Sequence, residues 1–162
     1  QTCALPIYLS REFSTRLEGR NCVAYNSDLH VKMEATGLWT YPDLSVACGD
    51  QRFLDSEEDV LLNPVLIAEI LSESTEAYDR GVKFAHYRTL SSLREYLLVS
   101  QWEPRIDQFI RRPGDAWLLR TTSGLRATLR LASWKLSIPL ARIFAKVQFP
   151  ATPIRPPAPP RR

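Results

Sequence analysis

The chain has 162 residues, a net charge of +3, and apolar and charged fractions of 44% and 24%, which exclude a disordered or a membrane-spanning protein. This length fits one domain with a sizeable core, and no signal peptide is apparent. The three cysteines, Cys3, Cys22 and Cys48, show neither metal-site nor disulfide spacing. We therefore expect a cytoplasmic protein with free thiols, in a reducing compartment and with no membrane partner.

The two ends of the chain differ from the rest. The opening "QTCALPI", residues 1–7, is similar to the translation of a common sequencing adapter, so we expect it to be non-native and the natural N-terminus to be missing. From Pro150, "PATPIRPPAPPRR" is about half proline, which predicts a disordered basic tail over residues 150–162. The folded domain is then expected over residues 8–149, and neither end is expected to contribute much to the core.

Helices are indicated by apolar residues at helical spacing. In "YLSREFSTRLEGR", Leu9, Phe13 and Leu17 lie four residues apart, which predicts an amphipathic helix ending near Gly19. A second helix is predicted over residues 72–90, with Gly81 near its middle. A short last helix is expected in "PLARIFAKV".

Strands are indicated by alternating or continuous apolar residues between turn-forming residues. They are expected within residues 21–34, 43–49, 63–71, 94–100, 105–112, 116–122 and 125–131. The acidic stretch 50–62 is expected to be a loop. The last strands are joined by short turns and predict an antiparallel meander. The order of elements predicts one mixed sheet flanked by helices, an α/β or α+β domain.

Two carboxylates occupy unusual positions in the predicted sheet. Glu69 lies inside the apolar run "NPVLIAEIL", near the end of a strand covered on both faces. Asp43 begins the strand in "YPDLSVACG", and the two can converge if these strands are neighbours. Two adjacent carboxylates repel unless a cation lies between them, and Mg²⁺ takes one or two carboxylates and completes its shell with water and phosphate. The pattern indicates a metal site at Asp43 and Glu69.

The predicted helix after Glu69 supplies a third group. Asp79, Lys83 and Tyr87 lie four residues apart, on one face. They form a salt bridge on a solvated helix face, or they direct Lys83 at the metal site. The sequence leaves both interpretations open.

Charge is segregated along the chain. Residues 50–79 hold nine acids and one base, and residues 104–146 hold nine bases and two acids. One interpretation is solvated loops and strand faces; the other is a cation-binding region beside a basic surface that meets phosphates. Arg105, Arg111 and Arg112 are candidates for that surface. The four tryptophans lack the regular spacing of a base-stacking platform and are expected to pack in the core or in hairpins.

Four motifs occur in order between about residue 9 and residue 149. They are "YPD", "LLNP", "STEAYDRG.KF..YR" and "SLREYLLV". In them the chain resembles the Uma-two family of restriction-endonuclease-like proteins, which is assigned to the PD-(D/E)XK nuclease superfold. The resemblance implies a mixed central sheet flanked by helices. It also implies that Asp43 matches the aspartate of the first half-motif and Glu69 the acidic member of the second.

The chain departs from the superfamily pattern at two places. The superfamily lysine would stand two residues after Glu69, where this sequence has Leu71. In this family the lysine is thought to lie on the following helix, which points to Lys83. Many members also carry an N-terminal segment with its own acidic residue, and we expect that segment to be missing here.

The resemblance implies a Mg²⁺- or Mn²⁺-dependent endonuclease that hydrolyses DNA, with Asp43, Glu69 and Lys83 as catalytic residues. The alternative is an inactive or truncated nuclease-fold domain that acts as a binding or assembly module. DNA is the expected partner, and a homodimer is left open.

Overall fold

The computed structural model describes residues 4–151. Cys3 and the greater part of the predicted tail, residues 152–162, lie outside the described residues. No helix in the described range is both long and apolar enough to cross a membrane.

Six strands form the main sheet, in the order β1-β4-β6-β7-β8-β9. These strands are β1 (Cys22–Asn26), β4 (Leu44–Cys48), β6 (Leu66–Ile70), β7 (Glu95–Val99), β8 (Arg105–Arg112) and β9 (Ala116–Ser123). Within this main sheet β6 and β7 pair in parallel, and the other four neighbouring pairs are antiparallel. The predicted mixed sheet is therefore confirmed. A parallel pair needs a crossover connection, and here the crossover contains α2 (Glu76–Arg80) and α3 (Val82–Tyr87).

Two smaller sheets flank the main one. A three-stranded sheet, in the order β3-β2-β5, consists of β2 (His30–Met33), β3 (Leu38–Thr40) and β5 (Val60–Leu61). The short strand β5 lies in the stretch that the sequence predicted to be a loop. The C-terminal strands are antiparallel, as expected, but β10 (Thr128–Leu131) and β11 (Leu136–Pro139) form a hairpin separate from the main sheet.

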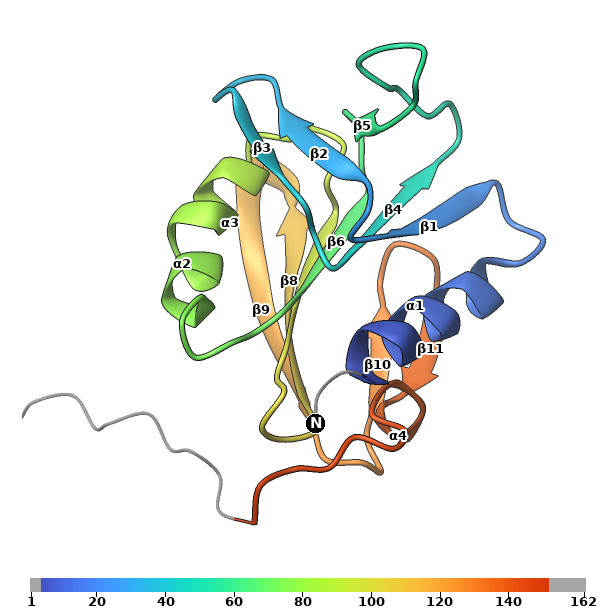
Figure 1. Cartoon of the computed structure of the whole chain (residues 1–162), viewed down its shortest axis with the longest axis vertical. Helices are drawn as coiled ribbons and strands as arrows, with labels where there is room; N and C mark the ends of the chain where they lie inside the picture. The colour runs from blue at the N-terminus through green and yellow to red at the C-terminus, as the bar shows by residue number, and fades with distance from the viewer. Residues whose placement is uncertain (1–3, 152–162) are drawn as a thin grey trace, which may run out of the picture.

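The main sheet is covered on both faces, as the continuous apolar run of β6 predicted (Figure 1). One face packs against α1 (Ala4–Leu17), the β10–β11 hairpin and α4 (Leu140–Ile143). Leu44, Leu66 and Leu97 of the sheet are buried in that layer. The opposite face packs against α3 and the three-stranded sheet, and its core is richer in aromatic side chains. Glu69 points to this second face.

The N-terminal helix begins earlier than the sequence predicted. Residues Ala4–Ile7 form its first turn, and Leu5 is fully buried with Leu9, Phe13 and Leu17 against the sheet. The expectation that residues 1–7 contribute little to the core is therefore wrong for Leu5. The reason is that Leu5 lies four residues, about one helical turn, before Leu9 and so continues the same apolar face.

The cysteine prediction is also wrong for two residues. Cys22 and Cys48 form a disulfide that joins β1 to β4. They are directly opposite in the antiparallel register, with Cα atoms 4.0 Å apart. Their separation of 26 residues in the sequence gave no sign of this, because only strand pairing brings them together. The cytoplasmic location stays a prediction.

The predicted long helix after Glu69 is divided at Gly81 into α2 and α3. Gly81 has φ −109° and ψ −95°, outside the helical region. A β-carbon on Gly81 would lie 3.1 Å from the carbonyl oxygen of Ala77, a crowded distance. The break therefore occurs at the residue without a side chain, while Asp79 and Lys83 still turn toward each other across it.

The burial of Leu5 leads to a stability prediction. Leu5→Ala should lower the free energy of unfolding by about 2–4 kcal/mol, because a fully buried leucine is truncated and leaves a cavity. Ile7→Ala is the matched control on the same helical turn, since Ile7 is 67% exposed, and it should change stability by less than about 0.5 kcal/mol. Urea denaturation of the two variants measures the difference. Equal effects would show that the first turn does not pack.

Candidate functional site

The two carboxylates singled out in the sequence face each other across neighbouring strands. Strands β4 and β6 are antiparallel, with Leu44 opposite Ala68, so one further step of this register places Asp43 opposite Glu69. Residues that are opposite in a sheet point to the same face. The Asp43 side chain also accepts a hydrogen bond from the Ile70 amide, with 2.7 Å between Oδ2 and N. The predicted convergence is confirmed.

Both carboxyl groups are harder to ionise than usual. Burial raises the pKa of Glu69 to about 7, against the opposing influence of Lys83 and Tyr87. Burial likewise raises the pKa of Asp43 above its ordinary value, although the Ile70 amide and the Lys83 charge oppose it. The negative charge of Asp43 raises the pKa of Glu69 further, because it disfavours a second negative charge nearby.

Lys83 lies at this pair and does not extend into solvent. Its Nζ is 2.7 Å from Glu69 Oε1 and 3.3 Å from Asp79 Oδ1. Burial by itself would lower the pKa of the ammonium, but the Glu69 charge and its hydrogen bond, helped by Asp79, raise it above the ordinary value. Of the two interpretations, a salt bridge on a solvated face is therefore wrong: the side chains of all three residues are largely buried.

Two further residues complete the immediate surroundings of Glu69. The Tyr87 hydroxyl donates to Glu69 Oε1 at 2.6 Å and lies 3.0 Å from the Thr40 hydroxyl. Asp79, almost fully buried, receives the second contact of Lys83. The sequence analysis did not count Tyr87 or Asp79 as site residues. The signal was present, because both share the helical face of Lys83.

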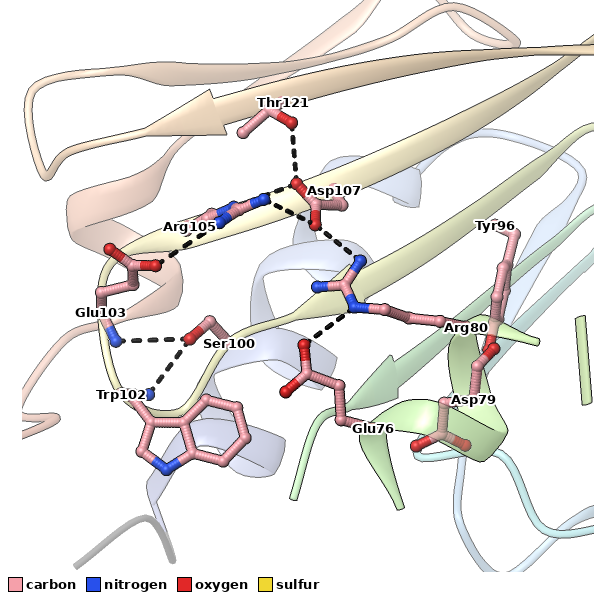
Figure 2. A network of polar contacts seen from close by, with 10 residues as sticks. All are labelled: Glu76, Asp79, Arg80, Tyr96, Ser100, Trp102, Glu103, Arg105, Asp107 and Thr121. Atoms are coloured by element: carbon pink, nitrogen blue, oxygen red, sulfur yellow. Dashed lines mark hydrogen bonds and ion pairs between the residues drawn. The ribbon is translucent and has the colours of Figure 1, made fainter. Parts of the chain in front are cut away.

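A network of ion pairs fixes α2 to the same face of the sheet (Figure 2). Arg80 Nη1 is 2.8 Å from Asp107 Oδ2, and Arg80 Nε donates to Glu76 at 2.8 Å. Asp107 also accepts from Arg105 on its own strand and from Thr121 on β9. These hydrogen bonds overcome the effect of burial and lower the pKa of Asp107, so it stays charged.

The ion-pair network lies at the same level of the sheet as the carboxylates. Glu69 is opposite Leu98, and Leu98 is opposite Asp107. One row across the sheet therefore holds Glu69 on β6 and Asp107 on β8. In addition, the Tyr96 hydroxyl donates to the backbone oxygen of Asp79 at 3.0 Å. Helix α2, which carries Asp79, is thus held by contacts with both β7 and β8.

The basic residues proposed for phosphate contact differ in their surroundings. Arg105 pairs with Glu103 and Asp107. Arg111 donates to the backbone oxygens of Arg88 and Leu90 and pairs with Asp115. Arg105 and Arg111 are therefore engaged within the fold. Arg112, at the end of β8, is exposed.

A model of the Uma2 family, described as "Putative restriction endonuclease", matches residues 4–141. The chain belongs to the Uma2 family. Two cyanobacterial relatives from Synechocystis sp. support this assignment. Uncharacterized protein sll1609 is 31% identical over 132 residues, which is 82% of this chain and 75% of that protein. Uncharacterized protein slr1290 is 40% identical over 115 residues, which is 71% of this chain but 60% of that protein, less than two thirds of its length.

The fold of this Uma2 chain is similar to that of a solved structure. It superposes on the crystal structure of a "putative nuclease belonging to DUF820" from Anabaena variabilis with a TM-score of 0.69 and 17% identity. The likeness covers 88% of this chain and 79% of the other. It confirms the nuclease-like fold that the sequence motifs implied.

The donor set of the Uma2 chain fits a hard divalent cation. Donors within residues 4–151 use one oxygen of each carboxylate, Asp43 Oδ2 and Glu69 Oε1. No group of three or more His, Cys, Asp or Glu side chains in this range could enclose a metal ion. Two carboxylates nevertheless suffice for Mg²⁺, which keeps several waters and binds substrate phosphate.

The ion pair between α2 and β8 leads to a second stability prediction. Arg80→Ala should destabilise the protein by about 1–3 kcal/mol, because the buried carboxylate of Asp107 loses a charged donor. Arg52→Ala is the control: Arg52 pairs with Glu34 where both side chains are exposed, and such a pair is worth less than about 1 kcal/mol. Thermal unfolding of both variants compares them. If the two losses are equal, Arg80 does not anchor α2.

The raised pKa of Glu69 predicts a pH dependence of stability. The folded value of about 7 lies above the ordinary 4.5, so the folded state binds the extra proton. Its stabilising contribution is complete below about pH 4.5 and is lost as pH rises through about 7. Glu69→Gln should therefore gain stability relative to the wild type between pH 5 and pH 8, by up to about 3 kcal/mol. Urea denaturation at both pH values measures this, and Glu34→Gln, at an exposed carboxylate, should show no such gain.

Proposed function

We propose that this protein is a divalent-metal-dependent endonuclease that hydrolyses DNA phosphodiester bonds. One observation carries the proposal: Asp43 and Glu69 face each other across β4 and β6, and Lys83 Nζ is 2.7 Å from Glu69 Oε1. Two carboxylates and one ammonium in a buried setting match the needs of phosphate hydrolysis, in which negative charge grows on the phosphoryl oxygens. Membership of a family described as "Putative restriction endonuclease" agrees with this chemistry.

In this proposal Asp43 and Glu69 hold Mg²⁺ or Mn²⁺. A bound cation would supply Lewis-acid polarisation of the scissile phosphate and a lower pKa for the attacking water. A proton competes with the cation for these oxygens, because burial raises the pKa of both carboxyl groups, that of Glu69 to about 7. Metal affinity should therefore increase as Glu69 loses its proton.

Lys83 has two roles in the proposal. Its raised pKa keeps the ammonium charged at neutral pH, so it can stabilise the negative charge that develops on the phosphate. Its contact with Glu69 Oε1 also fixes the orientation of that carboxylate. Tyr87 acts through Glu69, as a positioning residue that donates to the same oxygen.

The alternative is a nuclease-fold module without activity. It is favoured by the small number of ligands, since residues 4–151 contain no cluster of three or more metal-binding side chains. A titration with Mn²⁺ separates the two proposals. An active site should bind Mn²⁺ in the wild type and lose it in both Asp43→Ala and Glu69→Ala, whereas an inactive module has no reason to bind the ion there.

Plasmid nicking supported by Mn²⁺ tests the catalytic assignment. Lys83→Ala should reduce the nicking rate by roughly 10²–10³, because it removes one donor that stabilises the transition state, and should leave Mn²⁺ binding intact. Lys83→Arg should not restore the rate, since a planar guanidinium rarely replaces a compact ammonium.

Lys135→Ala is the charge-matched control for this experiment. Lys135 is exposed in the loop between β10 and β11, outside the proposed site, and its removal should leave nicking unchanged. Full activity in Lys83→Ala would refute the assignment of Lys83. A wild type that neither binds Mn²⁺ nor nicks DNA would favour the inactive module.

A further inference from the structure

An exposed aromatic cluster lies on the outer face of the β3-β2-β5 sheet, on the strand whose inner face contacts the candidate site. Trp39 and Tyr41, on and just after β3, are 45% and 56% exposed. Of the two places that the sequence analysis expected for Trp39, the core or a hairpin, the hairpin is correct, since Trp39 lies opposite Lys32 in the β2–β3 pair. The other three tryptophans, Trp102, Trp117 and Trp134, pack against the two hydrophobic cores. We call the surface formed by His30, Lys32, Trp39 and Tyr41 the aromatic cluster.

The cluster is ordered by strand pairing. Lys32 is opposite Trp39 in the antiparallel pair of β2 and β3, and one further step of the register places His30 opposite Tyr41. The His30 ring lies 3.6 Å from the Tyr41 ring and meets the edge of Trp39 at 5.8 Å. Lys32 Nζ lies 4.9 Å from the centre of the Trp39 ring. Aromatic rings and basic groups therefore alternate on one surface.

The same strand connects this cluster to the candidate site. Thr40, between Trp39 and Tyr41, points the other way and contacts the Tyr87 hydroxyl, which donates to Glu69. Tyr41 is two residues before Asp43, so their Cα atoms are at most about 7 Å apart. Tyr41 and the proposed metal ligand Asp43 are therefore close along the chain, with only Pro42 between them.

We propose that the aromatic cluster stacks an unpaired base of a single-stranded DNA segment next to the phosphate that is cleaved. The proposal rests on the proposed function for the location of that phosphate. Aromatic faces bind bases of any sequence, and nearby cationic groups attract the phosphates between them. A base within a duplex is already stacked on both sides, so the cluster selects unpaired over paired DNA.

Binding in EDTA tests the cluster without any cleavage. The probe is a labelled oligothymidylate of about 12 nucleotides, followed by fluorescence anisotropy. Trp39→Ala and Tyr41→Ala should each weaken binding about tenfold, and Tyr41→Phe should keep most of the affinity because the ring remains. Leu119→Ala is the matched control: Leu119 is an apolar residue of β9 that is 52% exposed, and its loss should not change binding.

An abasic oligonucleotide of equal length and charge distinguishes stacking from electrostatics. The wild type should bind it about tenfold more weakly than oligothymidylate, and Trp39→Ala should cause no further loss. A wild type that fails to bind oligothymidylate, or that binds duplex equally well, would overturn the proposal. So would unchanged affinity in both alanine variants.

Two controls separate this proposal from the nuclease assignment and from a dimer contact at the same surface. Asp43→Ala should abolish nicking and leave oligothymidylate binding intact, so that a failed nuclease assignment and a failed stacking assignment give different results. Analytical ultracentrifugation of the Trp39→Ala, Tyr41→Ala double variant tests whether a second copy of the chain binds the aromatic cluster instead. If the wild type is a dimer and the double variant a monomer with unchanged DNA affinity, the cluster joins two copies of the chain and the proposal is wrong.

Discussion

The contact of Lys83 with the buried carboxylate of Glu69, beside the half-buried Asp43, is the constraint on which this side of the structure depends. Asp43 and Glu69 lie on adjacent strands and point to the same face, where the Asp43 charge disfavours the ionisation of Glu69. Their burial is tolerated because Lys83, Tyr87 and the Ile70 amide supply compensating donors. A fold that needed only stability would be served as well by apolar residues at these positions.

The chain between β6 and β7 brings these donors to the carboxylates. Its path is a crossover between two parallel strands, and the break at Gly81 divides it into short helices that have little stability of their own. Their position is fixed instead by contacts with the sheet. Arg80 pairs with Asp107 (Figure 2), the Tyr96 hydroxyl donates to the Asp79 backbone oxygen, and the Phe84 ring stacks on Tyr96. The placement of Lys83 is therefore a property of the whole sheet.

The two faces of the sheet are specialised. The face under α1 is mainly apolar, with Glu95 and Gln108 paired and buried on it. It lies beside the edge strand β1 (Figure 1), which the disulfide of Cys22 and Cys48 joins to β4. The opposite face carries Asp43 and Glu69 beside the aromatic side chains of Phe84, Tyr87 and Tyr96, and the small β3-β2-β5 sheet is placed over it. Stability and proposed chemistry are thus assigned to different layers. This division fits the general rule that reactive groups are positioned by a rigid scaffold.

The sequence by itself determined the class of fold and the identity of the main candidates. Apolar alternation located nearly every strand of the main sheet, and helical spacing placed Lys83 on one face with Asp79 and Tyr87. These are local periodicities, and each depends only on neighbouring residues. Their agreement with the structure follows from burial of one face of each element.

The tertiary structure decided everything that depends on which elements become neighbours. The pairing of β4 with β6 brought Asp43 to Glu69, and the pairing of β1 with β4 joined two cysteines that the sequence treated as free thiols. Strand pairing likewise decided the exposed position of Trp39 on β3, because the sequence left open whether Trp39 packs in the core or in a hairpin. The physical reason is that register and exposure are set by contacts between segments distant in the chain, and such contacts leave no periodic signal in the sequence.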